Sequence, residues 1–459
     1  MKNLNKHFVT FPFMVAAIAM GLSSCTKHDQ ILDLTEVVTP TPTLDTDTLY
    51  SVSGTATLQP IGGGQWNGDV SQWSGAPALT VNAVVPDLGN GTFEGYIGNS
   101  TSIKMQSMHD ASNIYFLMEF NLSQKNCRSA QWYYNPTTKK WAQESSVPAL
   151  NSDNVTYRPA FIQDQLVLLF NVANSCPSFN TQSCYGACHL NSSYGGPINP
   201  GEGAMWTNGP TEVLDCWRCR ALQPMNMNQA MDAFIDDGSS VGTGMSGTLN
   251  KNEVHGDWQV LNGPSSTVPP ALQSPGLQVA APGASSSLAA DGGFTNKQNM
   301  QITFAPAGTK ENIPIWVVPN STYSAAPNYS AITLADTLSG AAVKVVGVDT
   351  NGVLYLANAT TIDPRTGTDY KQVGSGDGPK CIPGSIVGAY TGSRGDVTCN
   401  MYYTGTSVKF LIKRALTTTD AVYDVNFGSG NDFPFGVGAM FNGADNQHAI
   451  VAGLTLHLR

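Results

Sequence analysis

Alternation of hydrophobic and polar positions recurs along the chain and predicts β-strands. Residues 105–120 are predicted to form two strands joined by a turn at Asp110-Ala111-Ser112-Asn113. The second strand places four apolar side chains on one face at a period of two: Ile114, Phe116, Met118 and Phe120. This pattern is typical of a hairpin with one face in the protein core.

Other apolar segments extend the prediction of an all-β fold. The run from Gln165 to Val172 is continuously apolar and predicts a strand that is buried on both faces. Further strands are predicted in a hairpin over 343–356 that turns at 349–352, in two alternating runs within 397–414, and in two final segments, 435–440 and 450–456, that would close a sheet.

Two segments interrupt the strand pattern. Between residues 176 and 248 turn residues, Cys, Met and Trp crowd together and the alternation disappears, with a short helix predicted only over 226–236. Long segments without regular structure inside a domain are often functional. We therefore interpret 176–248 as a cysteine-rich functional insertion, and 262–295, rich in Ser, Gly, Ala and Pro, as a flexible loop.

The N-terminus has the features of an export signal. Lys2 and Lys6 precede an apolar segment, Phe8 to Gly21, that is short for a membrane span. The following tetrapeptide, Leu22-Ser23-Ser24-Cys25, resembles a bacterial lipobox, in which the cysteine is acylated; the alternative is an ordinary cleaved signal with a chance cysteine. We predict a lipid anchor at Cys25, a tether over 26–50 and a mature domain over 51–459, exported and held at the periplasmic face or the outer-membrane or cell surface.

Composition narrows the classes of partner. Only 12 % of the residues are charged and the formal net charge is −10, which argues against a nucleic-acid partner. No segment after residue 25 is long and apolar enough to span a bilayer. The sequence contains no H-E-x-x-H or P-loop motif, and we predict a binding or carrier protein rather than an enzyme.

The motif CYGACH, Cys184 to His189, carries the strongest chemical signal. Covalent haem attachment needs two thiols for the porphyrin vinyl groups and an adjacent histidine for the iron. Cys184, Cys188 and His189 supply these groups, with three residues between the thiols in place of the usual two. The alternative is a disulfide pair beside a surface histidine.

A second pair of cysteines lies in DCWRCRA, Asp215 to Ala221, where Arg220 occupies the position that a haem motif gives to histidine. Disulfides are the simpler interpretation, because thiols outside the cytoplasm usually oxidise. Cys216 or Cys219 would pair with Cys127 or Cys176, and Cys381 with Cys399. The candidates are Cys127, Cys176, Cys216, Cys219, Cys381 and Cys399.

The second iron ligand has several candidates, because His, Met and Lys can all ligate haem iron. These are Met225 and Met227, close to the motif, and His448; His109 and His255 are weaker. Each has a structural alternative, since methionine usually packs in a core and a lone histidine usually makes structural hydrogen bonds.

The order of several segments resembles the haem-binding domain of the gamma subunits of ethylbenzene dehydrogenase and dimethyl-sulfide dehydrogenase, in the branch of separate exported cytochromes. The matching blocks are HDASNIYFLMEF, DQLVLLFNV, CYGACH, DCWRCRA, IPIWVVP, GSRGDV, VKFLIKRALTTTDAVYDVNF and FNGADNQHAI. In DCWRCRA, Arg218, Cys219 and Arg220 replace the family's His, Trp and Lys.

This resemblance implies a β-sandwich, related to DOMON-type and carbohydrate-binding modules, that holds haem at one end. The family's C-terminal lysine ligand falls near His448, which favours His448 here, whereas Leu168 and Leu169 stand where its methionine ligand is expected.

The predicted function is therefore electron transfer by a c-type haem, with b-type haem as a possibility, to or from an exported redox enzyme or another cytochrome. The alternatives are a haem-free lipoprotein that binds carbohydrate or another ligand, with its eight mature cysteines in disulfides, and a catalytic haem protein such as a peroxidase.

Overall fold

The computed structural model describes most of the chain after residue 45. The described residues are 46–87, 95–123, 125–127, 131–144, 149–150, 157–158, 163–182, 207, 209, 211–236, 294–297, 300–304, 309–318, 332–366, 370, 382–390, 392–442 and 448–459. They all belong to one compact unit, Asp45–Arg459. The predicted signal segment, most of the tether and most of the 262–295 loop lie outside the described residues.

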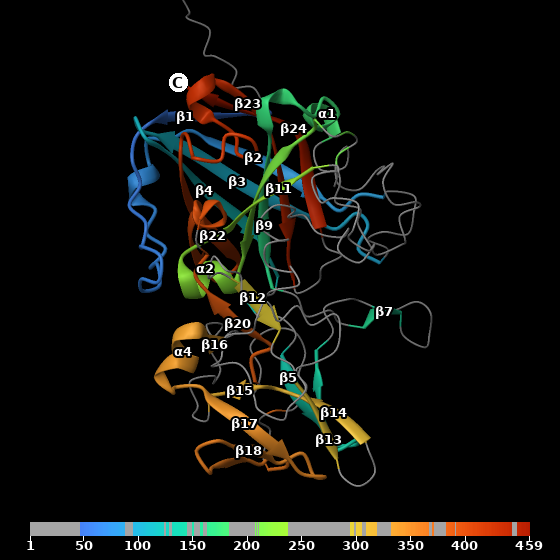
Figure 1. Cartoon of the computed structure of the whole chain (residues 1–459). Coiled ribbons are helices and arrows are strands. Elements are labelled where there is room, and N and C mark those ends of the chain that lie inside the picture. The colour runs from blue at the N-terminus through green and yellow to red at the C-terminus, as the bar shows by residue number, and fades with distance from the viewer. Residues whose placement is uncertain are drawn as a thin grey trace, which may run out of the picture. The chain divides into compact units, whose positions relative to one another are not determined.

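One large sheet dominates the described part of the chain (Figure 1). Its 11 strands follow the order β11-β10-β9-β23-β24-β1-β3-β4-β22-β21, and β2 pairs with both β24 and β3. The strands are β1 (Thr48–Ser53), β2 (Ala78–Val84), β3 (Ser100–His109), β4 (Asn113–Asn121), β9 (Gln165–Asn171), β10 (Leu214–Arg220), β11 (Met231–Ile235), β21 (Thr398–Tyr403), β22 (Ser407–Ala415), β23 (Asp432–Met440) and β24 (His448–Leu458).

The sheet folds over on itself and encloses an apolar interior, which we call the main core. Phe116 of β4 lies 6.1 Å from Phe170 of β9 and 5.8 Å from Trp217 of β10, measured between ring centroids, so the two halves of the sheet face each other. The chain before β11 also meets the beginning of β21, because the Ala230 amide donates to the Val397 carbonyl. The all-β, sandwich-like fold predicted from the sequence is confirmed.

Several predicted strands appear where the pattern placed them. The hairpin of β3 and β4 turns at Asp110, whose carboxylate accepts from the amides of Ser112 and Asn113. All residues of β9 are buried, as its continuous apolar run predicts. The strands at 343–348, 354–356, 398–403 and 407–415 are confirmed as well, and the two final segments form β23 and β24, which pair with each other between β9 and β1.

The prediction for 176–248 was wrong in part. Residues 214–220 form β10, the helix lies at α2 (Leu222–Met227), and the C-terminal part of the segment expected to be helical forms β11 (Met231–Ile235). Helix α2 ends because Asn228 adopts a left-handed conformation, with φ of 54°. Nearly every residue of β10 and β11 is buried, so these strands show no alternation for a period-two search to detect.

Short strands form a smaller β region with its own apolar core. Within it the Trp141 indole donates to the Gly352 carbonyl at 2.7 Å, which ties β6 to the turn between β17 and β18. The remaining elements are β5 (Trp132–Asn135), β6 (Lys140–Gln143), β7 (Ala149–Leu150), β8 (Tyr157–Arg158), β12 (Phe294–Lys297), β13 (Met300–Phe304), β14 (Thr309–Ile313), β15 (Trp316–Val317), β16 (Ile332–Thr333), β17 (Val343–Val348), β18 (Leu354–Leu356), β19 (Thr361–Ile362), β20 (Ser385–Gly388), α1 (Phe179–Gln182), α4 (Leu334–Ser339) and single 3-10 turns at Ser71–Trp73, Val172–Asn174, Ser393–Gly395 and Phe427–Ser429.

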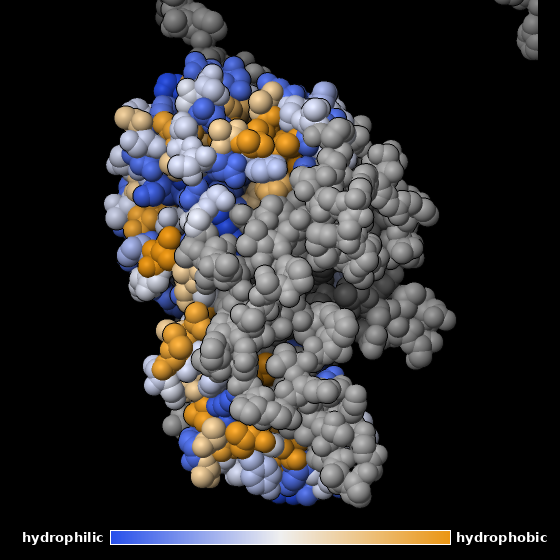
Figure 2. Space-filling view, in the orientation of Figure 1, coloured by the Kyte–Doolittle hydropathy of each residue, from blue (hydrophilic) through white to orange (hydrophobic). Residues whose placement is uncertain are grey.

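Polar and apolar residues mix on the visible face of the described structure (Figure 2). The large exposed apolar side chains of the described structure as a whole are spread over the sequence: Ile61, Val84, Ile97, Leu338, Val346, Tyr355, Tyr402 and Val422. Among the described residues, no helix has the length and hydropathy needed to cross a membrane.

Candidate functional site

The described structure approaches the predicted haem motif from its N-terminal side. Helix α1 ends at Gln182, and Cys184, Cys188 and His189 lie outside the described residues, as do Cys25 and Cys381. Helix α1 is therefore the described element that precedes the motif most closely in the sequence.

Helix α1 packs against β23 and β24. Its first residue, Phe179, is buried in an apolar cluster with Val167 of β9 and Ile450 of β24. The turn before α1 is fixed by Asn171, whose side chain donates to the Cys176 carbonyl at 2.8 Å and accepts from the Cys176 amide at 2.9 Å. The chain leading to CYGACH is thus anchored on one face of the sheet.

We call this surface the outer face: the side of β9, β10, β23 and β24 that points away from the main core. It carries Val167, Leu169, Cys216 and Ile450, which belong to a cluster separate from the main core. Side chains alternate between the faces along each strand, so residues two positions apart share a face.

His448 lies on this outer face. It is two positions before Ile450 on β24 and pairs across the strands with Met440. A Cβ atom added to the neighbouring Gly438 would approach the His448 Nε2 to 3.4 Å. The glycine therefore leaves room for the half-buried imidazole to lie against the sheet.

Arg218 and Arg220 of β10 lie on the same face, three strands away from β24. Gln165 of β9 pairs with Met440 on one side and with Arg220 on the other. Its Oε1 accepts from Arg220 Nε at 3.1 Å and from Arg218 Nη2 at 3.4 Å. Neighbouring strands are about 4.8 Å apart, so the row from His448 to Arg220 spans about 14 Å.

The methionine candidates lie elsewhere. Met225 packs against the main core, and Met227 packs against Leu222 and Val387. His109 lies on β3, where its Nδ1 is 3.1 Å from the Ser51 hydroxyl and burial lowers its pKa. Of His448, Met225 and Met227, only His448 shares the face on which α1 packs.

Cys216 and Cys219 point to opposite sides of β10, because three residues is an odd number of strand steps. Cys216 belongs to the cluster on the outer face, and Cys219 lies in the main core. The two thiols therefore cannot act together as a Cys-x-x-Cys metal chelate. Cys176 joins Cys216 on the outer side, whereas Cys127 and Cys399 join Cys219 in the main core.

The main core also contains an ionic cluster that the sequence analysis missed. Arg414 of β22 is wholly buried, and its Nη1 lies 2.5 Å from Asp215 Oδ2 and 3.9 Å from carboxylate oxygens of Asp232 and Asp424. Its Nη2 donates to the Val425 carbonyl. The guanidinium also lies 4.7 Å from the Trp217 ring centroid.

Three carboxylates around one guanidinium cannot all be ionised at low cost. Burial, followed by the charge of Asp215, raises the pKa of Asp232 well above its ordinary value. Burial likewise raises the pKa of Asp424 to about 7.

The carboxylate oxygens of Asp215, Asp232 and Asp424 are close enough together to ligate one ion. Arg414 already supplies a fixed positive charge among them, which opposes a divalent cation at the same place. We interpret this cluster as a structural charge network.

Comparisons with known proteins give no family assignment. No protein-family model matches this sequence, and a search of curated proteins finds no match.

Proposed function

We propose that this protein is an exported, lipid-anchored carrier of one haem group that transfers single electrons. The observation that carries the proposal is the convergence of two segments on the outer face. Helix α1, which leads directly into CYGACH, packs beside β24, and His448 lies on β24 on that same face. Only Ser183 separates Cys184 from Gln182, the last residue of α1, in the sequence.

The described residues fit the chemical character of a haem. A haem is flat and largely apolar, and it carries two carboxylates at one edge. The outer face is apolar beside α1, where Val167, Leu169 and Ile450 are buried in one cluster with Phe179, and the His448 imidazole lies over Gly438. Arg218 and Arg220 lie across the sheet, where guanidinium groups are suited to bind carboxylates.

Each residue then has a defined role. Cys184 and Cys188 would attach the porphyrin, and His189 would ligate the iron as the motif's histidine. His448 would be the second ligand, and Arg218 and Arg220 would fix the propionate edge. When bound, the haem supplies reversible one-electron chemistry, which the protein tunes through ligands, burial and nearby charge.

The partner in this proposal is an exported redox enzyme or another cytochrome, and acylated Cys25 holds the carrier at the membrane. Its protein groups bind and orient the haem without converting a substrate. The assignment as an electron carrier, and not an enzyme, is part of the proposal.

The visible spectrum of the full chain, produced in a host with a haem-attachment system, tests this function. We expect a sharp reduced α-band of covalent haem that resists acid–acetone extraction. Replacement of both motif cysteines, Cys184→Ala and Cys188→Ala, should abolish the covalent attachment. His448→Ala should preserve the attachment and change the low-spin spectrum, because one axial ligand is lost.

The same preparation separates the alternatives. A chain without Soret absorption would contradict the haem proposal and leave a ligand-binding lipoprotein. Haem that is extractable already from the unsubstituted chain would contradict the covalent attachment and indicate a b-type site. An unchanged spectrum in His448→Ala would contradict the role of His448, for which His109→Ala is the matched control.

A further inference from the structure

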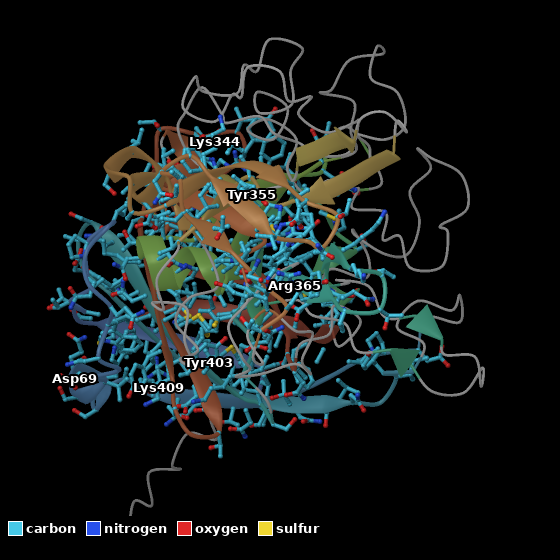
Figure 3. The ribbon with its side chains drawn as sticks, turned by 90° about the horizontal axis from the view of Figure 1, so that it is seen from below. Asp69, Lys344, Tyr355, Arg365, Tyr403 and Lys409 are labelled. Atoms are coloured by element: carbon cyan, nitrogen blue, oxygen red, sulfur yellow. The ribbon has the colours of Figure 1, made fainter. Side chains whose placement is uncertain are left out.

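Cys219 and Cys399, which the sequence analysis assigned to two different candidate disulfides, lie together in the main core. Cys219 of β10 and Cys399 of β21 are both wholly buried there. In the described structure they are thiols, and the Cys219 side chain hydrogen-bonds to the Cys399 side chain. Figure 3 draws all sulfur atoms in yellow, those of methionine as well as cysteine, and a group of them lies between the green helix and the Tyr403 label.

The strand registers explain why these side chains face each other. Cys399 pairs directly with Ile412 of β22, and directly opposed residues point to the same side of a sheet. Ile412 is a main-core residue, so Cys399 points inward. Cys219 shares its face with Trp217, which is also in the main core.

The backbone holds this approach in place. The Cys399 amide donates to the Asn228 carbonyl at 3.0 Å, just after α2. The Asn400 side chain donates to Asn228 Oδ1 at 3.1 Å. These bonds fix the start of β21 against the chain that follows β10, so the two thiols are positioned by the fold rather than by side-chain flexibility.

We propose that Cys219 and Cys399 form a disulfide bond in the exported protein. Two S–H bonds are broken and one S–S bond forms, with loss of two protons and two electrons. The oxidant is a disulfide of the thiol–disulfide exchange class that operates outside the cytoplasm, and it is reduced to two thiols. The bond would link β10 to β21 across the line where the ends of the sheet meet.

Burial determines when this reaction can occur. Thiol–disulfide exchange needs a thiolate, and burial, followed by the hydrogen bond that the Cys399 thiol makes to Cys219, raises the pKa of Cys399 well above its ordinary value. Oxidation therefore precedes complete packing of the core. Once formed, the bond is protected from external reductants by the same burial.

The pairing can be read directly from the full chain purified from an oxidising compartment. The protein is unfolded in iodoacetamide without reductant, digested, and analysed by mass spectrometry. We expect a linked pair of peptides that contain Cys219 and Cys399. Alkylation of both residues, or linkage of either one to Cys127 or Cys381, would overturn the proposal.

Thermal unfolding gives a second, independent test. If the bond exists, Cys219→Ala, Cys399→Ala and the double variant should each lower the melting temperature by a similar several degrees, because each removes the same bond. Reductant present during unfolding should lower the melting temperature of the unsubstituted protein and leave the double variant unchanged. Additive losses in the single variants, with no effect of reductant, would overturn the proposal even if the peptide map is incomplete.

Discussion

Arg414 and Asp215 form a wholly buried ion pair that joins the two halves of the folded sheet, with Nη1 2.5 Å from Oδ2. The Asp215 oxygen also accepts from the Val425 amide at 3.0 Å, so the pair fixes the loop after β22 as well as β10. Loss of either partner would leave the other charged group in the core.

We therefore expect Arg414→Met to lower the free energy of unfolding by about 3–5 kcal/mol, the range typical of a broken buried pair. Urea denaturation measures this loss. Arg365→Met is the matched control, because Arg365 makes a solvent-exposed pair with Asp363, with N···O of 2.6 Å. A similar loss of free energy of unfolding in both variants would contradict the prediction that the buried ion pair contributes more than the exposed one.

The stability of the protein should fall as the pH rises from about 4 to about 7. Burial raises the pKa of Asp424 to about 7, so the folded state holds a proton that the unfolded state releases near pH 4. The stabilisation from this proton is fully present below pH 4 and is lost as the pH approaches 7. The slope is at most about 1.4 kcal/mol per pH unit for one proton.

Asp424→Asn should reduce this slope, because the amide does not titrate. Urea denaturation between pH 4 and pH 7.5 measures the slope in both proteins. Asp432→Asn, at a carboxylate exposed at the start of β23, is the control and should show the same slope of stability against pH as the unsubstituted protein. A rise in stability over this range in the unsubstituted protein would contradict the prediction.

Substitution of Gly438 should affect the outer face without disrupting the sheet. An added Cβ would lie 3.4 Å from His448 Nε2, so Gly438→Ala is expected to be nearly neutral and Gly438→Leu to displace the imidazole. If His448 ligates haem, Gly438→Leu should change the low-spin absorption spectrum as His448→Ala does. Far-ultraviolet circular dichroism checks that the fold is retained, and an unaltered spectrum would contradict this position for the ligand.

Gly352 provides a test of the smaller β region. Its φ is +80° and an added Cβ would overlap the Tyr134 ring, whereas Gly340, with φ of +83°, has no atom within 4 Å of such a Cβ. Gly340→Ala should cost about 1 kcal/mol from the backbone alone. Gly352→Ala should cost clearly more, measured by thermal denaturation, and hydrogen exchange should increase in β17 and β18. Equal losses would exclude the steric contribution.

The sequence predicted the elements that bury one face or show a continuous apolar run. The hairpin of β3 and β4 and the buried strand β9 were recognised because their side chains follow a clear period. Strands β10 and β11 were missed because both of their faces are covered, by the main core on one side and by the outer cluster on the other. The order of strands could not be predicted, since it depends on pairings such as β9 with β23, which are far apart in the chain.

The charge network did leave a signal in the sequence. Arg414 continues the period of Val408, Phe410 and Ile412, which predicts a core position for a charged residue. Its partner, Asp215, lies 199 positions away, so no local pattern identifies it. The division of the cysteines into an inner and an outer group likewise follows from strand faces, which a spacing motif alone does not encode.

The position of β1 has a consequence for biosynthesis. This first strand lies between β24 and β3 and pairs in parallel with both, so its place in the sheet is incomplete until residues 448–458 have been made. The edge of β1 that pairs with β24 therefore stays unpaired during most of translation. Such long-range pairing slows folding and favours aggregation, so we expect a dependence on holding chaperones during synthesis.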